Sequence, residues 1–195
     1  MGEFADINPG LDLKLDDEDM VSFIPMEAVD DKDGRIVKND SKKLREVKTG
    51  YTRFQEGDVI WAKITPCMQN GKSAITRNLA NGIGFGSTEF HVIRSRDTDL
   101  LTNEFIHLLL RLREIRIAAT RYFVGSAGQQ RVPKVFLEDI YIPIPPLRIQ
   151  EDLVIRVAEA CFEIEKIRED MCKQRAKVLS EIEQIILGLR SVEEL

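Results

Sequence analysis

The segment WAKITPCMQNGKSAI, residues 61–75, combines two kinds of residue that decide how the first part of this chain folds. Apolar residues that favour β-strands stand at both ends, and polar or reactive side chains fill the middle. The pair Asn70-Gly71 is typical of a tight turn between antiparallel strands. The segment therefore predicts a β-hairpin whose end presents Lys63, Thr65, Cys67, Gln69, Asn70 and Lys72.

Similar short apolar runs lie on both sides of this hairpin, rich in Val, Ile, Phe and Thr and bounded by Gly, Asn, Asp or Pro. We predict strands at FIPM (23–26), DVIWAKI (58–64), SAIT (73–76) and TEFHVIR (88–94). The glycine-rich NGIGFGST (81–88) is interpreted as a connection. It is not a dinucleotide fingerprint, because no helix begins there and a strand follows.

Helical spacing begins near Thr102, where Phe105, Leu108, Leu109, Leu112, Ile115 and Ala119 predict one amphipathic helix. Arg111, Arg113 and Arg116 are among its polar positions. GSAGQQRVP (125–133) then predicts a loop. VFLEDIYIPIPP (135–146) predicts an extended stretch, and its prolines confine it to a sheet edge or to the surface.

A long heptad pattern follows Pro146. Residues 147–187 contain neither proline nor glycine, so a helix of roughly 40 residues and about 60 Å is expected. Such an apolar seam needs a partner helix, and the chain offers no second helix of similar length, so we expect the partner to be another copy or another protein. The seam residues are Val154, Val157, Cys161, Ile164, Met171, Val178, Ile182, Ile185 and Leu189, with Arg168 and Arg175 completing the repeat.

Charge is unevenly distributed along the 195 residues. The net charge is −9 over residues 1–33, +9 over 34–134 and −5 over 135–195. The overall acidity argues against a polyanionic partner, but attraction to phosphate is local, so the basic middle segment permits one. The absence of a long apolar run and of a secretory signal indicates a cytoplasmic protein without a membrane segment.

Two catalytic interpretations, a cysteine nucleophile and a metal nuclease site, have little support in the sequence. The cysteines, Cys67, Cys161 and Cys172, form no C-x-x-C pair, which favours reduced thiols without a zinc site. A Cys67 nucleophile would need His91 or His107 as its base, and no local signature supports that pair. A metal nuclease site could be built from Glu46, Lys48 and the acidic run at residues 30–33, but acidic loops are far commoner than such sites.

The polar residues of the basic segment are better suited to nucleic acid. Lys and Arg neutralise phosphates and bind guanine, whereas Asn and Gln pair with adenine. The alternative is that GQQRVPK is a structural turn whose glutamines satisfy buried backbone groups. The candidate contacts are Arg53, Lys63, Thr65, Asn70, Lys72, Arg77, Gln129, Gln130 and Arg131, with Gln69 and Ser126 in the same loops.

The order of three motifs resembles one half of the specificity (S) subunit of type I restriction-modification systems. They are GDVIWAKITPCMQNGKSAI (57–75), GFGSTEFHVIR (84–94) and GSAGQQRVPKVFLEDIYIPIPPLRIQ (125–150), the last leading into the long helix. GEFADINPG (2–10) also resembles the opening of such a domain. The resemblance implies a target recognition domain for half of a split DNA site, and a spacer helix that docks methyltransferase subunits and pairs antiparallel with a second spacer.

The chain departs from that family pattern in two places. It carries one recognition domain and one helix, as expected of a half-subunit or a truncated product. It also has Arg148-Ile149 where the family often has an acidic residue before the glutamine. The methyltransferase motif Asn/Asp-Pro-Pro-aromatic is missing, since Asn8-Pro9-Gly10 and Ile144-Pro145-Pro146-Leu147 both differ from it. The resemblance therefore implies neither catalysis nor a cofactor.

We thus predict an α+β protein, with a mainly antiparallel β-sheet recognition domain (1–146) and a long coiled-coil helix (147–195). Its expected function is non-catalytic recognition of double-stranded DNA at a bipartite site. The expected partners are methyltransferase subunits, restriction subunits acting through them, and a second copy bound as an antiparallel homodimer. Alternatives are a recognition domain from a methyltransferase-nuclease fusion, a structural adaptor that does not bind DNA, and a metal nuclease.

Overall fold

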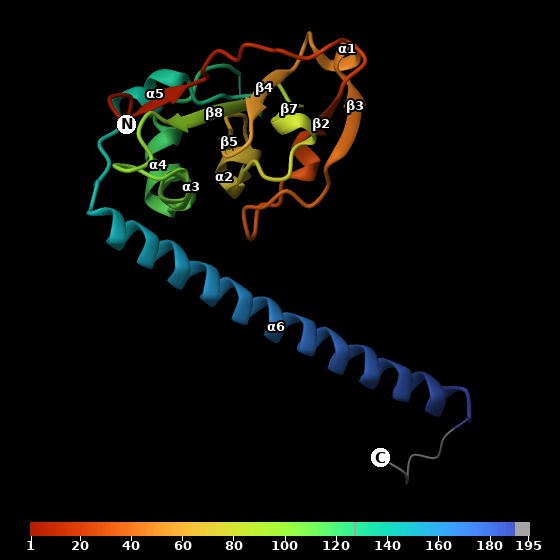
Figure 1. The fold of residues 1–195 in the computed structure, drawn as a ribbon. Helices are drawn as coiled ribbons and strands as arrows, with labels where there is room; N and C mark the ends of the chain where they lie inside the picture. Colours follow the sequence, from red (N-terminus) through yellow and green to blue (C-terminus); the bar gives the residue numbers. More distant parts are fainter. Residues whose placement is uncertain (127, 190–195) are drawn as a thin grey trace. The chain divides into compact units, whose positions relative to one another are not determined.

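The predicted hairpin strands belong to the first of two four-stranded sheets in the computed structural model, which describes residues 1–126 and 128–189 (Figure 1). This sheet has the order β1-β8-β5-β6, and every neighbouring pair is antiparallel. Its strands are β1 (Ala5–Ile7), β5 (Val59–Ala62), β6 (Ser73–Ile75) and β8 (Phe90–Ser95). The hairpin register sets Trp61 opposite Ser73.

The second sheet has the order β3-β2-β7-β4. The pairs β2·β3 and β4·β7 are antiparallel, whereas β2·β7 is parallel. These strands are β2 (Met20–Ile24), β3 (Asp40–Lys43), β4 (Thr52–Gln55) and β7 (Ile83–Gly86). Together with the helices described below, the two mainly antiparallel sheets confirm the predicted α+β class.

Strand β7 corrects the interpretation of NGIGFGST as a connection. The run of glycines obscured a strand that is central to its sheet. A Cβ on Gly84 would lie 2.1 Å from the Phe54 ring, and one on Gly86 would lie 2.3 Å from the Ile24 carbonyl oxygen. These glycines therefore allow the close approach of neighbouring strands, which a pattern based on β-prone side chains does not detect.

Strand β5 is buried on both faces and joins two parts of the core. Ile60 and Ala62 pack with Ile24 and Phe54 of the other sheet. Val59 and Trp61 point the opposite way and pack against the helices. This alternation follows from the two-residue period of a strand, and it explains why the run VIWA has no polar face.

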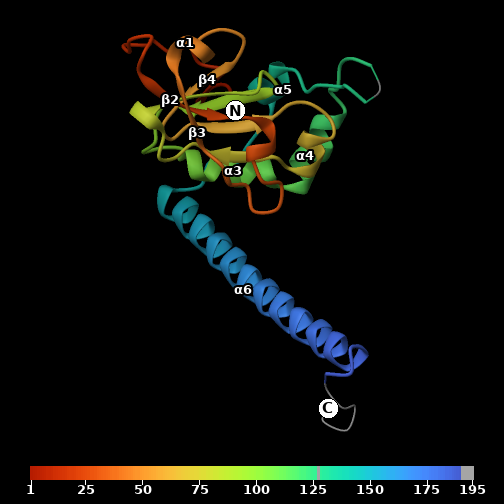
Figure 2. The same cartoon turned by 90° about the vertical axis from the view of Figure 1, so that its right-hand side faces the viewer.

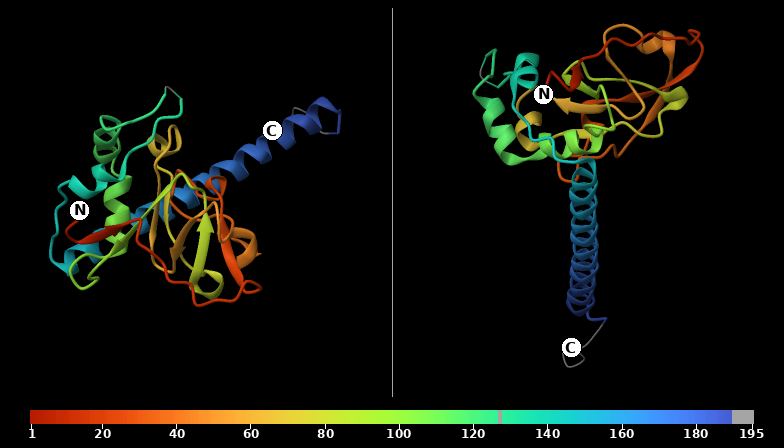
Figure 3. Two further views of the ribbon diagram at one scale, coloured as in Figure 1. Left: turned by 90° about the horizontal axis from the view of Figure 1, so that it is seen from above. Right: turned by 60° about the vertical axis from the view of Figure 1, so that its left-hand side comes forward.

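Helices α3 (Asn103–Arg111), α4 (Arg113–Thr120) and α5 (Lys134–Asp139) lie to one side of the strands, as the left panel of Figure 3 shows. Strands β2, β3 and β4 gather with α1 (Leu44–Val47), away from α4 and α5 (Figure 2). The remaining short elements are α2 (Cys67–Asn70) and the 3-10 turns η1 (Met26–Ala28) and η2 (Ala80–Gly82).

Two predictions about this region were wrong. The single helix expected from Thr102 is broken at Leu112, whose ψ of 135° is not helical, and the break lets Leu110 of α3 and Ala119 of α4 enter the same core. The expected extended stretch begins instead as α5. Phe136 and Leu137 are adjacent and both buried, which a helix permits and an alternating strand does not.

Helix α6 (Leu147–Ile186) is 40 residues long, as the heptad pattern predicted. The chain divides into two compact units, and we call Met1–Val154 the head. The head therefore includes the first two turns of α6. Gln150, in the first of these turns, is fully buried: its amide donates to the Leu100 and Pro145 carbonyls at 2.8 Å each and accepts from the Thr102 backbone N–H at 3.0 Å. None of the helices among the described residues is long and apolar enough to cross a bilayer.

Candidate nucleic-acid interface

Two segments far apart in sequence form a small ladder in the head. The Thr65 N–H donates to the Gln130 carbonyl, and the Val132 N–H donates to the Lys63 carbonyl, at 2.9 Å each. Ile64 and Arg131 form an antiparallel bridge between these bonds. The structure thus brings together four predicted contact residues, Lys63, Thr65, Gln130 and Arg131.

The segment 124–131 is itself folded back in a hairpin. Val124 and Arg131 exchange both backbone hydrogen bonds, at 3.0 and 2.9 Å. Within this turn the Gln129 N–H donates to the Ser126 carbonyl at 3.0 Å. The predicted loop GSAGQQRVP is therefore closed by the Val124–Arg131 bridge and carries exposed Ser126 and Gln129, while Ala127 lies outside the described residues.

Helix α2 follows the ladder directly and occupies the end of the predicted hairpin. Its C-cap is Gly71, with a left-handed φ of 89°. The Asn70-Gly71 signal therefore marks the end of a helical turn, not a two-residue β-turn. The strand pairing expected from WAKITPCMQNGKSAI is confirmed, and α2 presents Gln69 and Asn70 as exposed side chains.

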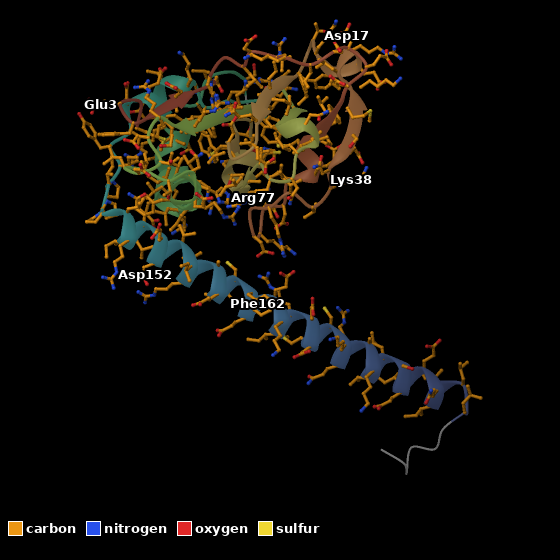
Figure 4. All side chains as sticks on the ribbon, in the orientation of Figure 1. Glu3, Asp17, Lys38, Arg77, Asp152 and Phe162 are labelled. Carbon is orange, nitrogen blue, oxygen red and sulfur yellow. The ribbon has the colours of Figure 1, made fainter. Side chains whose placement is uncertain are left out.

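Four predicted contact residues have partners inside the head. The Arg131 guanidinium contacts both carboxylate oxygens of Glu89, with Nε at 2.9 and 3.0 Å. Arg77, labelled in Figure 4, pairs with Glu104 at 2.6 Å. Arg53 donates to the Lys48 carbonyl at 2.8 Å. Lys72 donates to two backbone carbonyls described below.

A second set of predicted residues is unengaged. Among the described residues, the side chains of Lys63, Gln69, Asn70, Gln129 and Gln130 form no hydrogen bond or ion pair. The buried Thr65 hydroxyl also finds no partner there. Gln69, Asn70 and Gln129 are exposed, and Lys63 and Gln130 are half-buried. Side chains without internal partners are available to a ligand, whereas the engaged cations would first have to break a bond. The assignment of individual contact residues stays a prediction.

His91 supports the ladder from the core side. Its Nε2 donates to the Val132 carbonyl at 2.8 Å, and Nδ1 accepts from the Asn8 amide at 3.1 Å. Burial lowers the pKa of His91, so the ring is neutral near pH 7. His107 contacts the Ser73 hydroxyl at 3.2 Å. Both imidazoles thus have structural partners other than Cys67, which packs beside the inter-sheet core.

Asp30 and Lys48, two residues of the metal-nuclease alternative, have partners within the head. Asp30 accepts from the Asp33 backbone N–H at 2.6 Å, and Lys48 pairs with Asp17 at 2.8 Å. The described residues contain no group of three His, Cys, Asp or Glu side chains that could hold a metal ion.

Sequence reasoning missed the structural role of Arg111 and Arg116. It treated them as polar positions of an amphipathic helix, but both guanidiniums donate to backbone carbonyls. Arg111 donates to those of Gly71 and Lys32, and Arg116 donates to that of Gln69 in α2. The only hint that the sequence offered was the presence of glycine at positions 34 and 71. In the structure each of these glycines has a positive φ, and an arginine guanidinium lies where its side chain would be.

Most of the predicted α6 seam is exposed beyond the head. Val157, Ile164, Met171, Val178 and Ile182 are 43–65% exposed. Cys161 and Ile185 are half-buried, and Leu189 is 75% exposed. Phe162, labelled in Figure 4, is 72% exposed outside the seam. Val154 differs because it packs against the core of the head.

Comparison with known proteins gives consistent matches. The family model described as the type I restriction modification DNA specificity domain matches residues 1–166. The chain is 43% identical over 155 residues to the EcoAI specificity subunit of Escherichia coli, covering 80% of this chain and 26% of the relative. It is 36% identical over 169 residues to the EcoEI specificity subunit, also of Escherichia coli, covering 87% of this chain and 28% of the relative.

Two solved structures share the fold. The HsdS subunit from Thermoanaerobacter tengcongensis aligns with a TM-score of 0.67 at 22% identity, over 87% of this chain and 41% of that one. A chain from a study of complex assembly and conformational transition of the type I R-M system gives the same TM-score and identity, over 89% and 43%. The chain thus spans about a quarter of the curated relatives and less than half of the solved chains.

Proposed function

The chain belongs to the family of type I restriction-modification DNA specificity subunits, and from that premise we propose that its head reads the base sequence of double-stranded DNA. Members of this family are specificity components and are not themselves catalytic, as predicted for this chain. The methyl transfer and cleavage that such a component directs would be carried out by partner subunits.

One observation carries the proposal for DNA reading. Lys63, Gln69, Asn70 and Gln129 come from two segments joined by the ladder at Ile64 and Arg131, and their side chains have no bonding partner among the described residues. Amides can pair bidentately with base edges, and lysine neutralises phosphate, so this set combines the two kinds of contact that a reader needs.

Substitution of the amides tests this directly. Duplexes that the full chain selects from a randomised pool would be titrated by fluorescence anisotropy. We expect Asn70→Ala and Gln129→Ala each to weaken binding of the selected duplex about tenfold, the effect of losing a good base contact. Gln174→Ala, which removes an exposed amide from α6, should leave affinity unchanged. Equal binding by all variants would rule out these amides as readers.

The proposal extends to partners. We propose that the exposed seam of α6 pairs antiparallel with a second copy, and that methyltransferase subunits dock on this helical part and bring restriction subunits with them. The apolar exposure of Val157, Ile164 and Ile182 supports helix pairing. Two identical heads related by a two-fold axis would read an interrupted palindrome.

Mapping of methylated bases tests the assembly. DNA would be incubated with the chain, the cognate methyltransferase subunit and methyl donor. Methylation at two inverted half-sites with a fixed spacing supports the dimer, and methylation at a single asymmetric half-site contradicts it. Binding to the methyltransferase subunit without salt-dependent DNA affinity would favour a structural adaptor instead.

A further inference from the structure

Three cations of the head donate to backbone carbonyls in two neighbouring loops. One is the turn formed by α2 and its C-cap Gly71, and the other is the loop from Met26 to Ile36. The first is Lys72, the residue after the C-cap of α2. Its ammonium donates to the Val29 carbonyl at 2.8 Å and to the Met26 carbonyl at 3.1 Å. These oxygens lie at opposite ends of the turn that follows β2. The Lys72 side chain therefore bonds the chain segment that follows α2 to the start of the loop that runs from Met26 to Ile36.

The second cation, Arg111 at the end of α3, joins the same two loops at another point. Its Nη1 donates to the Gly71 carbonyl at 3.1 Å. Its Nη2 donates to the Lys32 carbonyl and more weakly, at 3.4 Å, to that of Asp31. One guanidinium thus bridges the C-cap of α2 to the tip of the loop at residues 30–36. A lysine cannot reproduce this planar fork.

The third cation, Arg116 of α4, holds α2 from another element. Its Nη1 donates to the Gln69 carbonyl. Its Nε is buried and has no hydrogen-bond partner among the described residues, so the side chain is held mainly by this contact and by packing. The exposed amides of Gln69 and Asn70 therefore extend from a turn attached to α4 by Arg116 and to α3 by Arg111.

Two glycines make room for these guanidiniums. A Cβ on Gly34 would lie 2.4 Å from Arg111 Nη1, and one on Gly71 would lie 3.1 Å from Arg116 Nη1. Both glycines also have positive φ values, 69° and 89°, which side chains with a Cβ rarely adopt. The loop conformations and the arginine positions consequently depend on each other.

We propose that Lys72, Arg111 and Arg116 are positioning residues that fix α2 and the loop at residues 30–36 as one rigid DNA-reading surface. This proposal rests on the proposed function. It adds exposed Lys32 and its loop to the surface, and it assigns Lys72 to internal support instead of phosphate contact. Loops that are ordered before binding do not lose conformational entropy when they meet DNA, and they hold the amides in one geometry.

The chemical rival is that the same cations bind phosphate. The two roles differ in salt dependence, because a lost phosphate contact lowers the slope of log K against log[salt] by about one. A positioning residue leaves that slope unchanged and alters discrimination between sequences. Arg111→Lys separates the roles, because it keeps the charge but loses the bridging fork.

The experiment uses the full chain, a duplex selected from a randomised pool, and a scrambled duplex of equal composition. For Arg111→Lys we expect the affinity ratio between the two duplexes to fall at least about tenfold, with the salt slope unchanged. Gly34→Ala, which displaces the same guanidinium without changing any charge, should lower the ratio in the same way. Arg113→Lys, an exposed change on the neighbouring helix, is the matched control and should match wild type.

Several outcomes would overturn the inference. It fails if Arg111→Lys and Gly34→Ala keep the wild-type ratio, or if they only lower the urea midpoint while the folded protein discriminates normally. It also fails if Arg111→Met lowers the salt slope while the ratio stays constant, since this is the signature of a phosphate contact. Wild-type protein that discriminates no duplex contradicts the proposed function itself, which is a separate result.

Discussion

The head and the part of α6 beyond it satisfy their side chains in opposite ways. In the head even a carboxylate, Asp58, is only 1% exposed and is fully bonded within the chain. On α6, apolar residues such as Ile182 and Phe162 are 47% and 72% exposed. The head therefore derives its stability from its own contacts. The helix presents apolar area that only another surface can cover.

The strongest test of the self-contained head is its buried ion pair. Arg94 binds both oxygens of Asp58, at 2.7 and 2.8 Å. Arg94→Met leaves the buried carboxylate without its charge partner, so the free energy of unfolding should fall by about 3–5 kcal/mol. Urea denaturation followed by circular dichroism measures this loss.

A matched exposed pair provides the control. Arg96 lies 2.7 Å from Asp6, and both side chains are about half exposed, at 50% and 47%. Arg96→Met should cost less than about 1 kcal/mol, because water screens and solvates this pair. Equal losses in the two variants would show that burial in the head does not strengthen its ionic contacts.

Acid should destabilise the head through His107. Burial, and then the charge of Arg111, lower the pKa of this imidazole from 6.5 to about 4. The folded protein therefore binds fewer protons than the unfolded chain between these values. The contribution of neutral His107 to the free energy of unfolding is fully present above pH 6.5. It is lost as the pH falls to about 4, and the loss is on the order of 3 kcal/mol at most.

The pH effect can be assigned by substitution. His107→Gln cannot titrate, so its unfolding free energy should change less between pH 7 and pH 4.5 than that of wild type. The remaining slope has a contribution of the same sign from His91, whose pKa is also lowered by burial. An unchanged pH profile in His107→Gln would contradict the assignment.

Gln150 tests where the head ends along α6. Its amide bonds Leu100, Pro145 and Thr102, and Gln150→Leu removes all of these bonds from a buried position. We expect a loss of about 1–3 kcal/mol in the unfolding free energy of the head. Gln184→Leu, at an exposed position of α6, should leave the head unaffected. Equal effects would mean that this contact does not join the first helical turn to the head.

The smallest effect on the head should come from the seam. Ile182→Asp places a charge at a heptad position and should raise the dissociation constant for self-association at least about tenfold, with the melting of the head unchanged. Ser180→Asp adds the same charge at an exposed position off the seam and serves as the control. Light scattering coupled to size exclusion measures both; a wild-type monomer at tens of micromolar would exclude the dimer.

Helices and strands that depend on a sequence pattern within one short stretch of the chain were predictable. The heptads after Pro146 predicted α6, and the run DVIWAKI (58–64) predicted the strand that the structure shows as β5. Strand β7 was missed because Gly84 and Gly86 have no β-prone side chain, and their role depends on Phe54 and Ile24 of neighbouring strands. Helix α5 was missed because the prolines that follow it, Pro143, Pro145 and Pro146, suggested an extended chain.

The candidate site divides in the same way. The sequence indicated which amides and cations lie in the loops, because composition and motif order are local properties. It did not separate Asn70, which is unengaged, from Lys72 and Arg131, which bond inside the head. Arg111 and Arg116 were seen only as the polar face of a helix, since their partners lie about 40 and 47 residues away.

The sequence by itself determined the long helix, its apolar seam, the mixed α+β composition and the family. Each depends on residue order over short distances or on motifs read in series. Only the tertiary structure decided which cations bond to backbone carbonyls inside the head and which polar side chains have no partner among the described residues. The physical reason is that an ammonium or guanidinium bonds equally well to a carbonyl, a carboxylate or a phosphate, so its role depends on which acceptor the fold places within reach.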